Sequence, residues 1–263
     1  MSVTILGKEY DIETTTALNL NNKNLDSIPK EVFSLVNLIT LRIVNNNITE
    51  LPDEIGKLVN LRELYIAQNL IEDLGSEVCN LTNLKELSLS NNQIKVLPSE
   101  INKLCNLKEF NLSGNQLKVF PYELSSCLSL KFLWLSNNQI EILTDDIGKF
   151  TGLIELDLSH NQLKNISSEI KKLKIVHDLS LTHNQIVNVP KEIMQLGAFE
   201  VDETSYDIDN LDLDTEILII SHLNGDLTNL PINLKQLYFK KYLEKYITNF
   251  NIKVPFGCEI IFF

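Results

Sequence analysis

A 23-residue repeat runs without insertion or deletion from position 38 to position 198 of this chain. The segment LITLRIVNNNITELPDEIGKLVN at 38–60 recurs as LRELYIAQNLIEDLGSEVCNLTN at 61–83 and in five further copies. A less regular copy at 15–37 precedes them, so eight units occupy 15–198. Because so short a unit cannot bury its apolar face alone, neighbouring units must stack into a solenoid with one continuous core.

Each unit opens with two apolar residues that are two positions apart, such as Leu41 and Ile43. That spacing places both side chains on one side of a short strand, which we expect to face the core. An asparagine follows where the chain leaves the strand, and its amide can both donate and accept hydrogen bonds between adjacent units. We expect a buried asparagine ladder, with Lys23 at its first position, formed by Asn46, Asn69, Asn92, Asn115, Asn138, Asn161 and Asn184.

A proline followed two residues later by an acid marks the other side of most units, as in Pro52 and Glu54. Proline suits the start of a helical turn, and an acidic side chain is favourable near the positive helix end. The pattern predicts a short helical or 3₁₀ turn in each unit. Gly75, Thr144 and Ser167 replace the proline, so we expect looser turns there.

The unit L-x-x-L-x-L-x-x-N-x-[LI]-x-x-L-P-x-E-[IL] resembles the leucine-rich repeat, and in detail that of intracellular proteins of the Ras-group scaffold type. The resemblance covers 15–198. It implies an α/β solenoid shaped as a curved horseshoe, with a parallel β-sheet on the concave face and short helical or 3₁₀ turns on the convex face. It also implies an adaptor that binds other proteins, among them small GTPases and phosphatases, through the concave sheet.

Two flanking segments complete the predicted organisation. Residues 1–14 contain two short strands around Gly7 and are expected to form a hairpin that caps the first repeat. The segment 199–263 resembles degenerate repeats with a C-terminal cap, and we expect its last strand to cover the open end of the array. Its motifs L-P-x-N-L-K-x-L and K-V-P-F-G-C are similar to those of repeat proteins from amoebae and their giant viruses.

The charge of the chain favours a protein partner with a basic surface. Its net charge of −12 and pI near 4.8 argue against a nucleic acid or an anionic lipid as the main partner. We read no charged-then-apolar leader and no membrane-spanning apolar run. The four cysteines show no C-x-x-C pair or capping cluster, which favours structural thiols and predicts an intracellular, cytoplasmic location.

We predict a binding surface from the strand positions that face away from the core. The residues between the paired apolar positions should line the centre of the concave sheet: Asn19, Arg42, Tyr65, Ser88, Asn111, Trp134, Asp157 and Ser180. We predict Trp134, Phe132 and Tyr65 as anchors, because exposed aromatics are enriched at binding hot spots. The alternative is that these rings pack on one another or on aliphatic stems such as those of Lys131 and Lys108.

A column of acids should run beside this centre line. It contains Glu63, Glu86, Glu109, Phe132, Glu155 and Asp178. Like charges on neighbouring strands repel, so the column needs either internal counter-charges or a basic partner. Basic side chains one position away could neutralise the first three acids, namely Arg62, Lys85, Lys108 and Lys131. Glu155, Asp157 and Asp178 lack such basic neighbours. They are therefore the better candidates for contacts with a basic partner.

His160 and His183 occupy equivalent places in adjacent units, immediately before ladder asparagines. We include them, with Arg42 and Asn111, among the predicted partner contacts, and we predict no metal and no cofactor, because a repeat stacks identical residues automatically.

No catalytic motif pairs a nucleophile with a base in the sequence. The function predicted is therefore a non-enzymatic protein-interaction scaffold or adaptor. The alternative is a regulatory or targeting subunit of a phosphatase, GTPase or ligase complex. A less favoured reading is a metal-dependent hydrolase around the two histidines.

Overall fold

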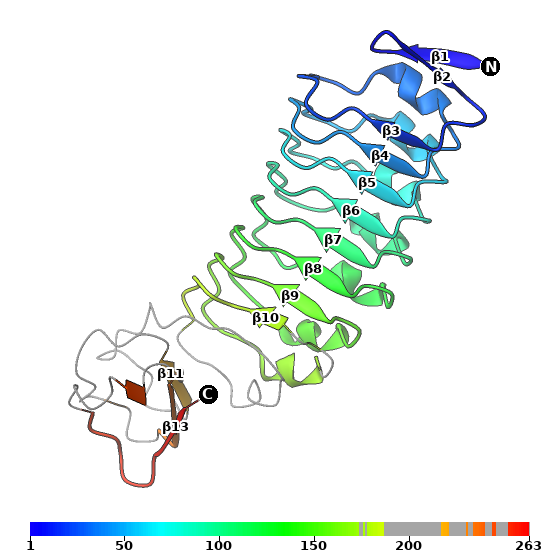
Figure 1. The fold of residues 1–263 in the computed structure, drawn as a ribbon. Helices are drawn as coiled ribbons and strands as arrows, with labels where there is room; N and C mark the ends of the chain where they lie inside the picture. The colour runs from blue at the N-terminus through cyan, green and yellow to red at the C-terminus, as the bar shows by residue number, and fades with distance from the viewer. Residues whose placement is uncertain are drawn as a thin grey trace.

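The computed structural model describes residues 1–173, 176, 178–186, 217–220, 230, 234–239, 244–245 and 252–262. Eight parallel strands stack in chain order into one sheet (Figure 1). The strands are β3 Ala17–Asn19, β4 Thr40–Arg42, β5 Glu63–Tyr65, β6 Glu86–Ser88, β7 Glu109–Asn111, β8 Phe132–Trp134, β9 Glu155–Asp157 and β10 Asp178–Ser180. Equivalent residues of successive repeats pair directly, as Leu41 does with Leu64. The fold predicted from the repeat is confirmed.

The middle residue of each strand and the apolar residue two positions later point into the core. Leu41, Ile43, Leu64 and Ile66 have no exposed surface, and the equivalent residues of the other units are likewise buried. The first and third residues of a strand point to the opposite side of the sheet. Two columns of side chains therefore line the inner sheet surface, which faces away from the core, one from first positions and one from third positions.

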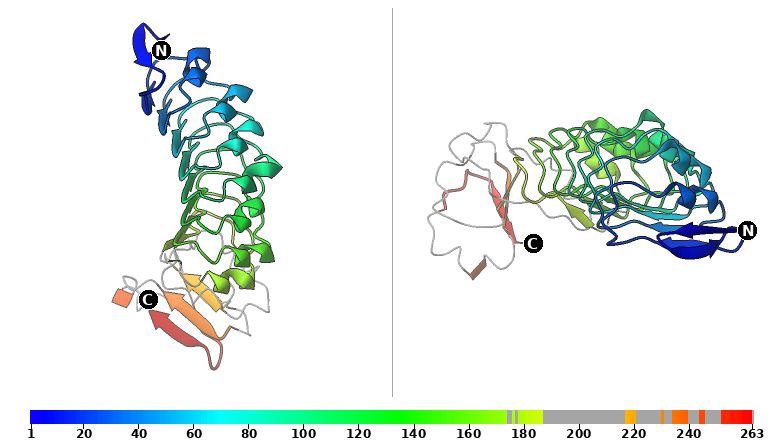
Figure 2. Two further views of the ribbon diagram at one scale, coloured as in Figure 1. Left: turned by 90° about the vertical axis from the view of Figure 1, so that its right-hand side faces the viewer. Right: turned by 90° about the horizontal axis from the view of Figure 1, so that it is seen from above.

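The return side of each of the first seven coils carries a 3₁₀ helix. These are η1 Lys30–Ser34, η2 Asp53–Lys57, η3 Glu77–Asn80, η4 Ser99–Lys103, η5 Tyr122–Ser126, η6 Asp145–Lys149 and η7 Ser168–Lys172. Pro52 immediately precedes η2, and its carbonyl accepts a hydrogen bond from the Ile55 N–H at 2.9 Å, which closes the turn. Figure 2 shows the strands along the inner side of the gentle curve and the 3₁₀ helices along its outer side.

The three turns without proline differ from one another. The turn after Gly75 is shorter by one residue, because η3 has four residues where the others have five. The turns after Thr144 and Ser167 keep five residues. Ser167 replaces the proline by a side-chain cap, since its Oγ accepts a hydrogen bond from the Glu169 N–H at 3.1 Å. The expectation of looser turns is therefore wrong for Thr144 and Ser167.

The recurring asparagines tie each coil to its neighbours. Asn92 Nδ2 donates to the carbonyls of Ile66, in the preceding coil, at 3.0 Å and of Leu89, in its own coil, at 2.9 Å. Its Oδ1 accepts from the Ile71 N–H at 3.1 Å. The same arrangement recurs at Asn46, Asn69, Asn115, Asn138, Asn161 and Asn184, all of them buried. At the first ladder position, the backbone N–H of Lys23 donates to Asn46 Oδ1, so the ladder begins at Asn46.

The N-terminal hairpin consists of β1 Ser2–Ile5 and β2 Lys8–Asp11, paired antiparallel. Gly7 takes the left-handed conformation that the tight turn between them requires, with φ of 78°. Ile5 is buried, and Val3, Tyr10 and Ile12 pack against the core. The hairpin therefore covers apolar surface at the first coil.

Three further strands form a separate parallel sheet: β11 Ile217–Ile220, β12 Gln236–Phe239 and β13 Glu259–Phe262. Leu237 of β12 pairs with Ile260 of β13, so these two strands keep the spacing of the regular repeat. In the described part of the chain β13 pairs with β12 and not with β10. The expectation that the last strand covers the open end of the array stays a prediction, because residues 187–216 lie outside the described part of the chain.

Parts of the predicted organisation fall outside the described residues, namely the return side of the eighth repeat and much of the segment 199–263. Within the part that is described, no helix has both the length and the apolar character needed to cross a membrane.

Candidate functional site

The inner sheet surface presents two columns of side chains, fixed by the in-register pairing of the eight strands. The first column contains Ala17, Thr40, Glu63, Glu86, Glu109, Phe132, Glu155 and Asp178. The second contains Asn19, Arg42, Tyr65, Ser88, Asn111, Trp134, Asp157 and Ser180. In these eight strands Arg42 is the one basic residue against six carboxylates. The sheet surface is therefore strongly acidic.

The N-terminal half of this surface carries an internally satisfied cluster around Tyr65. The Arg42 guanidinium lies over the Tyr65 ring, 4.0 Å from its centroid, and its Nη2 is 3.6 Å from Glu63 Oε2. Thr40 Oγ1 also donates to Glu63, at 3.1 Å. The Tyr65 hydroxyl donates to Glu86. Burial raises the pKa of Tyr65 to about 12, and the hydrogen bond to Glu86 adds to the effect.

The contacts of this cluster show which residue compensates the charge of Glu63, the first acid of the column. The counter-charge of Glu63 is Arg42, which belongs to the second column, and not a lysine one position away. In the described part of the chain, Arg62, Lys85, Lys108 and Lys131 form no ion pair with the column acids. Compensation by these four residues therefore does not take the form of ion pairs, although the charge of Lys108 does lower the pKa of Glu109.

The C-terminal half of the surface centres on an aromatic pair in β8. The rings of Phe132 and Trp134 are stacked with centroids 5.8 Å apart and an interplanar angle of 17°. Trp134 Nε1 donates to Glu155 Oε1 on the next strand at 2.5 Å. Both rings are partly exposed on the sheet. The rings thus pack on one another, as the alternative reading expected, while part of each still faces outward.

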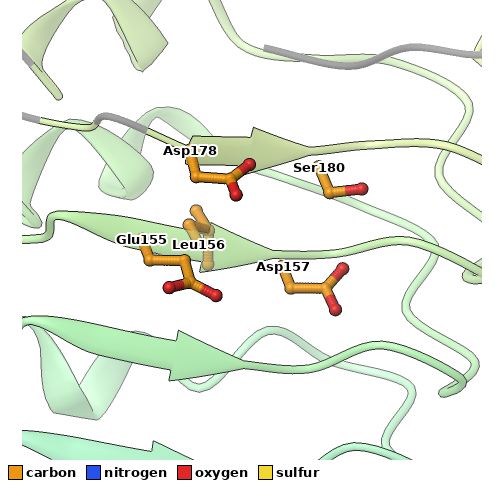
Figure 3. Close-up of a pocket in the computed structure, with 5 residues that line it drawn as sticks. All are labelled: Glu155, Leu156, Asp157, Asp178 and Ser180. Atoms are coloured by element: carbon orange, nitrogen blue, oxygen red, sulfur yellow. The ribbon is translucent and has the colours of Figure 1, made fainter. Parts of the chain in front are cut away.

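Three carboxylates lie next to this aromatic pair. Figure 3 shows Glu155 and Asp157 on β9 beside Asp178 and Ser180 on β10, around a hollow of about 270 Å³. Asp157 Oδ1 accepts a hydrogen bond from the Ser159 N–H at 2.9 Å. In the described part of the chain, none of the three carboxylates has an ion-pair partner. Their negative charge is therefore uncompensated there.

Glu109, at the centre of the first column, shows the effect of this charge. Burial raises the pKa of its carboxyl, and the neighbouring charges of Glu86 and Glu155 raise it further. Lys108 lowers it, but less than the other causes raise it. A positive charge brought onto this surface would relieve that repulsion.

The two histidines stack on each other, with ring centroids 4.0 Å apart and planes 9° apart. Both have positive φ, at 53° for His160 and 56° for His183, as do Asn45 and Asn91 at the equivalent place. Histidine and asparagine enter the left-handed region more readily than most residues, so the pair is explained by the turn. The described residues contain no group of three or more His, Cys, Asp or Glu side chains arranged to hold a metal.

The structure therefore separates the predicted partner contacts into two groups. Five of them lie together on β8–β10: Phe132, Trp134, Glu155, Asp157 and Asp178. Arg42 lies on β4 and Tyr65 on β5. Asn111 pairs with Trp134 in register, but its Oδ1 accepts from the Ser113 N–H at 3.0 Å and is thus committed to the backbone.

Two contacts were missed by reasoning from the sequence. The stacking of Arg42 on Tyr65 could have been found, because the two residues occupy the same column one repeat apart. The hydrogen bond from Trp134 to Glu155 had a weaker signal, since it crosses between columns and depends on both side-chain rotamers.

Family models described as leucine rich repeat match residues 13–71, 59–117 and 82–140, and a second such model matches 152–173. Together these segments make up more than half of the chain. A comparison with curated protein sequences gave no match.

Solved structures of several leucine-rich-repeat proteins resemble this chain. One is a protein of Leptospira interrogans, 28% identical, with a TM-score of 0.60, over 94% of this chain and 71% of that one. An internalin (inlF) of Listeria monocytogenes is 22% identical, with a TM-score of 0.65, over 95% and 87%. The ectodomain of the receptor kinase GASSHO1/SCHENGEN3 from Arabidopsis thaliana, in complex with CASPARIAN STRIP INTEGRITY FACTOR 2, is 24% identical with a TM-score of 0.59, over 89% and 31%.

Proposed function

Because this chain belongs to the leucine-rich-repeat family, we propose that it acts by binding a protein partner on its concave sheet and not by catalysis. Arrays of this kind typically mediate protein–protein interaction. The Arabidopsis ectodomain, solved in a complex, is one array that holds another molecule. The finer assignment to a scaffold or adaptor of the Ras-group type is part of this proposal and rests on the form of the repeat unit.

The observation that carries the proposal is the aromatic pair beside uncompensated acids. Phe132 and Trp134 are partly exposed, and Glu155 is the hydrogen-bond acceptor of the indole. Asp157 and Asp178 line the adjoining hollow. Large aromatics at the centre of a polar surface are typical of binding hot spots. We call the surface formed by these five residues the β8–β10 surface.

The charge of this surface defines the partner's chemistry. A partner with lysine or arginine side chains would place positive charge against Glu155, Asp157 and Asp178, which lack a counter-charge in the described chain. Such charges mainly steer association and set specificity. We therefore propose a basic partner surface. We expect the cluster around Tyr65 to contribute less to partner binding, because Arg42 already covers the Tyr65 ring and pairs with Glu63.

The test uses the whole chain, carrying an affinity tag, as wild type and as two variants. Trp134→Ala removes the aromatic anchor, and Ile142→Ala is the matched control, because Ile142 is 65% exposed but lies outside the eight strands. Proteins captured from a lysate are identified by mass spectrometry, and the most enriched one is then prepared and titrated directly.

We expect Trp134→Ala to weaken binding of that purified partner by about 30-fold or more, the effect of a hot spot worth about 2 kcal/mol. Ile142→Ala should leave the affinity unchanged. Binding should also weaken as ionic strength rises, because the charges on the surface are exposed. Equal affinity of wild type and Trp134→Ala would contradict the proposal.

An intracellular location is also a proposal, based on the four unpaired cysteines. It is tested by fractionating the native source and blotting for the chain.

A further inference from the structure

Two cysteines meet on the convex side of adjacent coils. Cys127 directly follows η5, and Cys105 lies one residue beyond the end cap of η4. Cys105 Sγ lies 3.1 Å from the carbonyl oxygen of Asn102, and Cys127 Sγ lies 3.6 Å from the same oxygen. The two sulfur atoms can be no further apart than these two distances together. Both thiols therefore share one backbone acceptor, which brings them together on neighbouring coils.

The two thiols differ in their environment. Cys105 is exposed, whereas only 3% of Cys127 is exposed. Burial raises the pKa of the Cys127 thiol to about 11, and the neighbouring Cys105 adds to the shift. Cys127 therefore remains protonated near neutral pH, and an oxidant reaches Cys105 first.

Cys79 is the natural comparison. It is buried in η3, and burial also raises the pKa of its thiol to about 11. The charged groups that act on it are Glu100, Lys103 and Glu77, with no cysteine among them. It therefore has the burial of Cys127 without a neighbouring thiol.

We propose that Cys105 and Cys127 form a redox pair that a peroxide converts into a disulfide linking the two coils. In the first step hydrogen peroxide oxidises the Cys105 thiol to a sulfenic acid, as the peroxide O–O bond breaks and one water leaves. In the second step the Cys127 sulfur attacks the Cys105 sulfur. The S–S bond forms while the sulfenic oxygen leaves as a second water, taking the Cys127 proton.

A monothiol such as glutathione can reverse the reaction. Its thiolate attacks the protein disulfide, and a second glutathione releases the reduced pair together with glutathione disulfide. The disulfide would connect two coils directly and constrain the unfolded chain. The two cysteines follow η4 and η5 and neither belongs to the β8–β10 surface. The inference is therefore independent of the proposed function.

The experiment treats the full chain with hydrogen peroxide and compares wild type, Cys105→Ser and Cys79→Ser. Free thiols are counted, and a non-reduced tryptic digest is read by mass spectrometry. Cleavage after Lys103, Lys108, Lys118 and Lys131 places Cys105 in LCNLK and Cys127 in VFPYELSSCLSLK. These two peptides separate unless a disulfide joins them.

We expect wild type and Cys79→Ser each to lose two thiols, to yield the joined peptides and to melt several degrees higher after oxidation. Cys105→Ser should yield no joined peptide and no rise in melting temperature. The proposal is overturned if oxidised wild type contains only Cys105 sulfinic acid, or if its disulfides join two chains on a non-reducing gel. Unchanged thiols in wild type would overturn it as well.

Discussion

Replacing Asn92 with alanine should destabilise the array strongly, because the amide is buried and satisfies three backbone groups. The substitution removes the bonds to the Ile66 and Leu89 carbonyls and from the Ile71 N–H, at 3.0, 2.9 and 3.1 Å. The two carbonyls keep bonds from Asn69 Nδ2 at 3.2 Å and Asn115 Nδ2 at 3.0 Å. Asn92 is 7% exposed, so bulk water does not replace the amide freely. A buried backbone group left without a hydrogen bond costs about 1–3 kcal/mol of folding free energy. A carbonyl that keeps another hydrogen bond costs less than an N–H that loses its bond.

From these contacts we expect a loss of about 3 kcal/mol in the free energy of unfolding. For a chain of this size this corresponds to a fall in Tm of about 6–12 °C. The matched control is Asn60→Ala. Asn60 Nδ2 also donates to a carbonyl in the preceding coil, that of Val36 at 3.0 Å, but the bond is exposed. Water can satisfy this carbonyl, so the expected loss is below about 1 kcal/mol.

The measurement is urea unfolding followed by circular dichroism for wild type and both variants. Comparable slopes must accompany the change in midpoint, since a long repeat array can lose cooperativity. If Asn92→Ala and Asn60→Ala cost the same, burial of the ladder amide is not what stabilises the stack, and the reasoning is refuted.

Three further predictions concern the core and the sheet surface. Leu133→Ala, in the fully buried middle of β8, should cost about 2–5 kcal/mol in urea unfolding, because it leaves a cavity. The folded pKa of Tyr65 is raised to about 12 from about 10 in the unfolded chain, so its stabilising effect is complete below pH 10 and is lost as the pH rises through 12. Wild type and Tyr65→Phe are titrated with base while the absorbance of tyrosinate is followed. The difference between the two curves should have its midpoint at the raised pKa of Tyr65. The pKa of Glu109 is also raised, which penalises its charged form in the folded state, so Glu109→Gln should raise Tm at pH 7 and have no such effect at pH 3.

The fold was predictable because the repeat fixes the neighbours of every residue. Once the period is known, Leu41 must lie beside Leu64, and Asn69 beside Asn92. The strands, the core and the ladder follow from that periodicity and from the chemistry of leucine and asparagine. The tail was foreseen as degenerate repeats, but the pairing of its strands was not, because β11 and β12 do not keep the regular spacing.

The pairing of charges on the sheet surface was not predictable in the same way. Arginine, lysine and glutamate have long side chains, and the register fixes where their Cα atoms lie but not where their charges lie. Arg42 reached Glu63 across the two columns, while Lys85 did not reach the column acids. Similarly, the repeat placed Glu155 near Trp134, but only the rotamers created the hydrogen bond.

Trp134 fluorescence tests the central claim most directly, because this is the single tryptophan of the chain. In the free protein, caesium should quench it more strongly than iodide, since the indole lies beside Glu155 and the other carboxylates. Adding the purified partner should shift the emission and protect the indole from both ions. An emission spectrum and quenching that stay the same at saturating partner would show that the partner binds elsewhere.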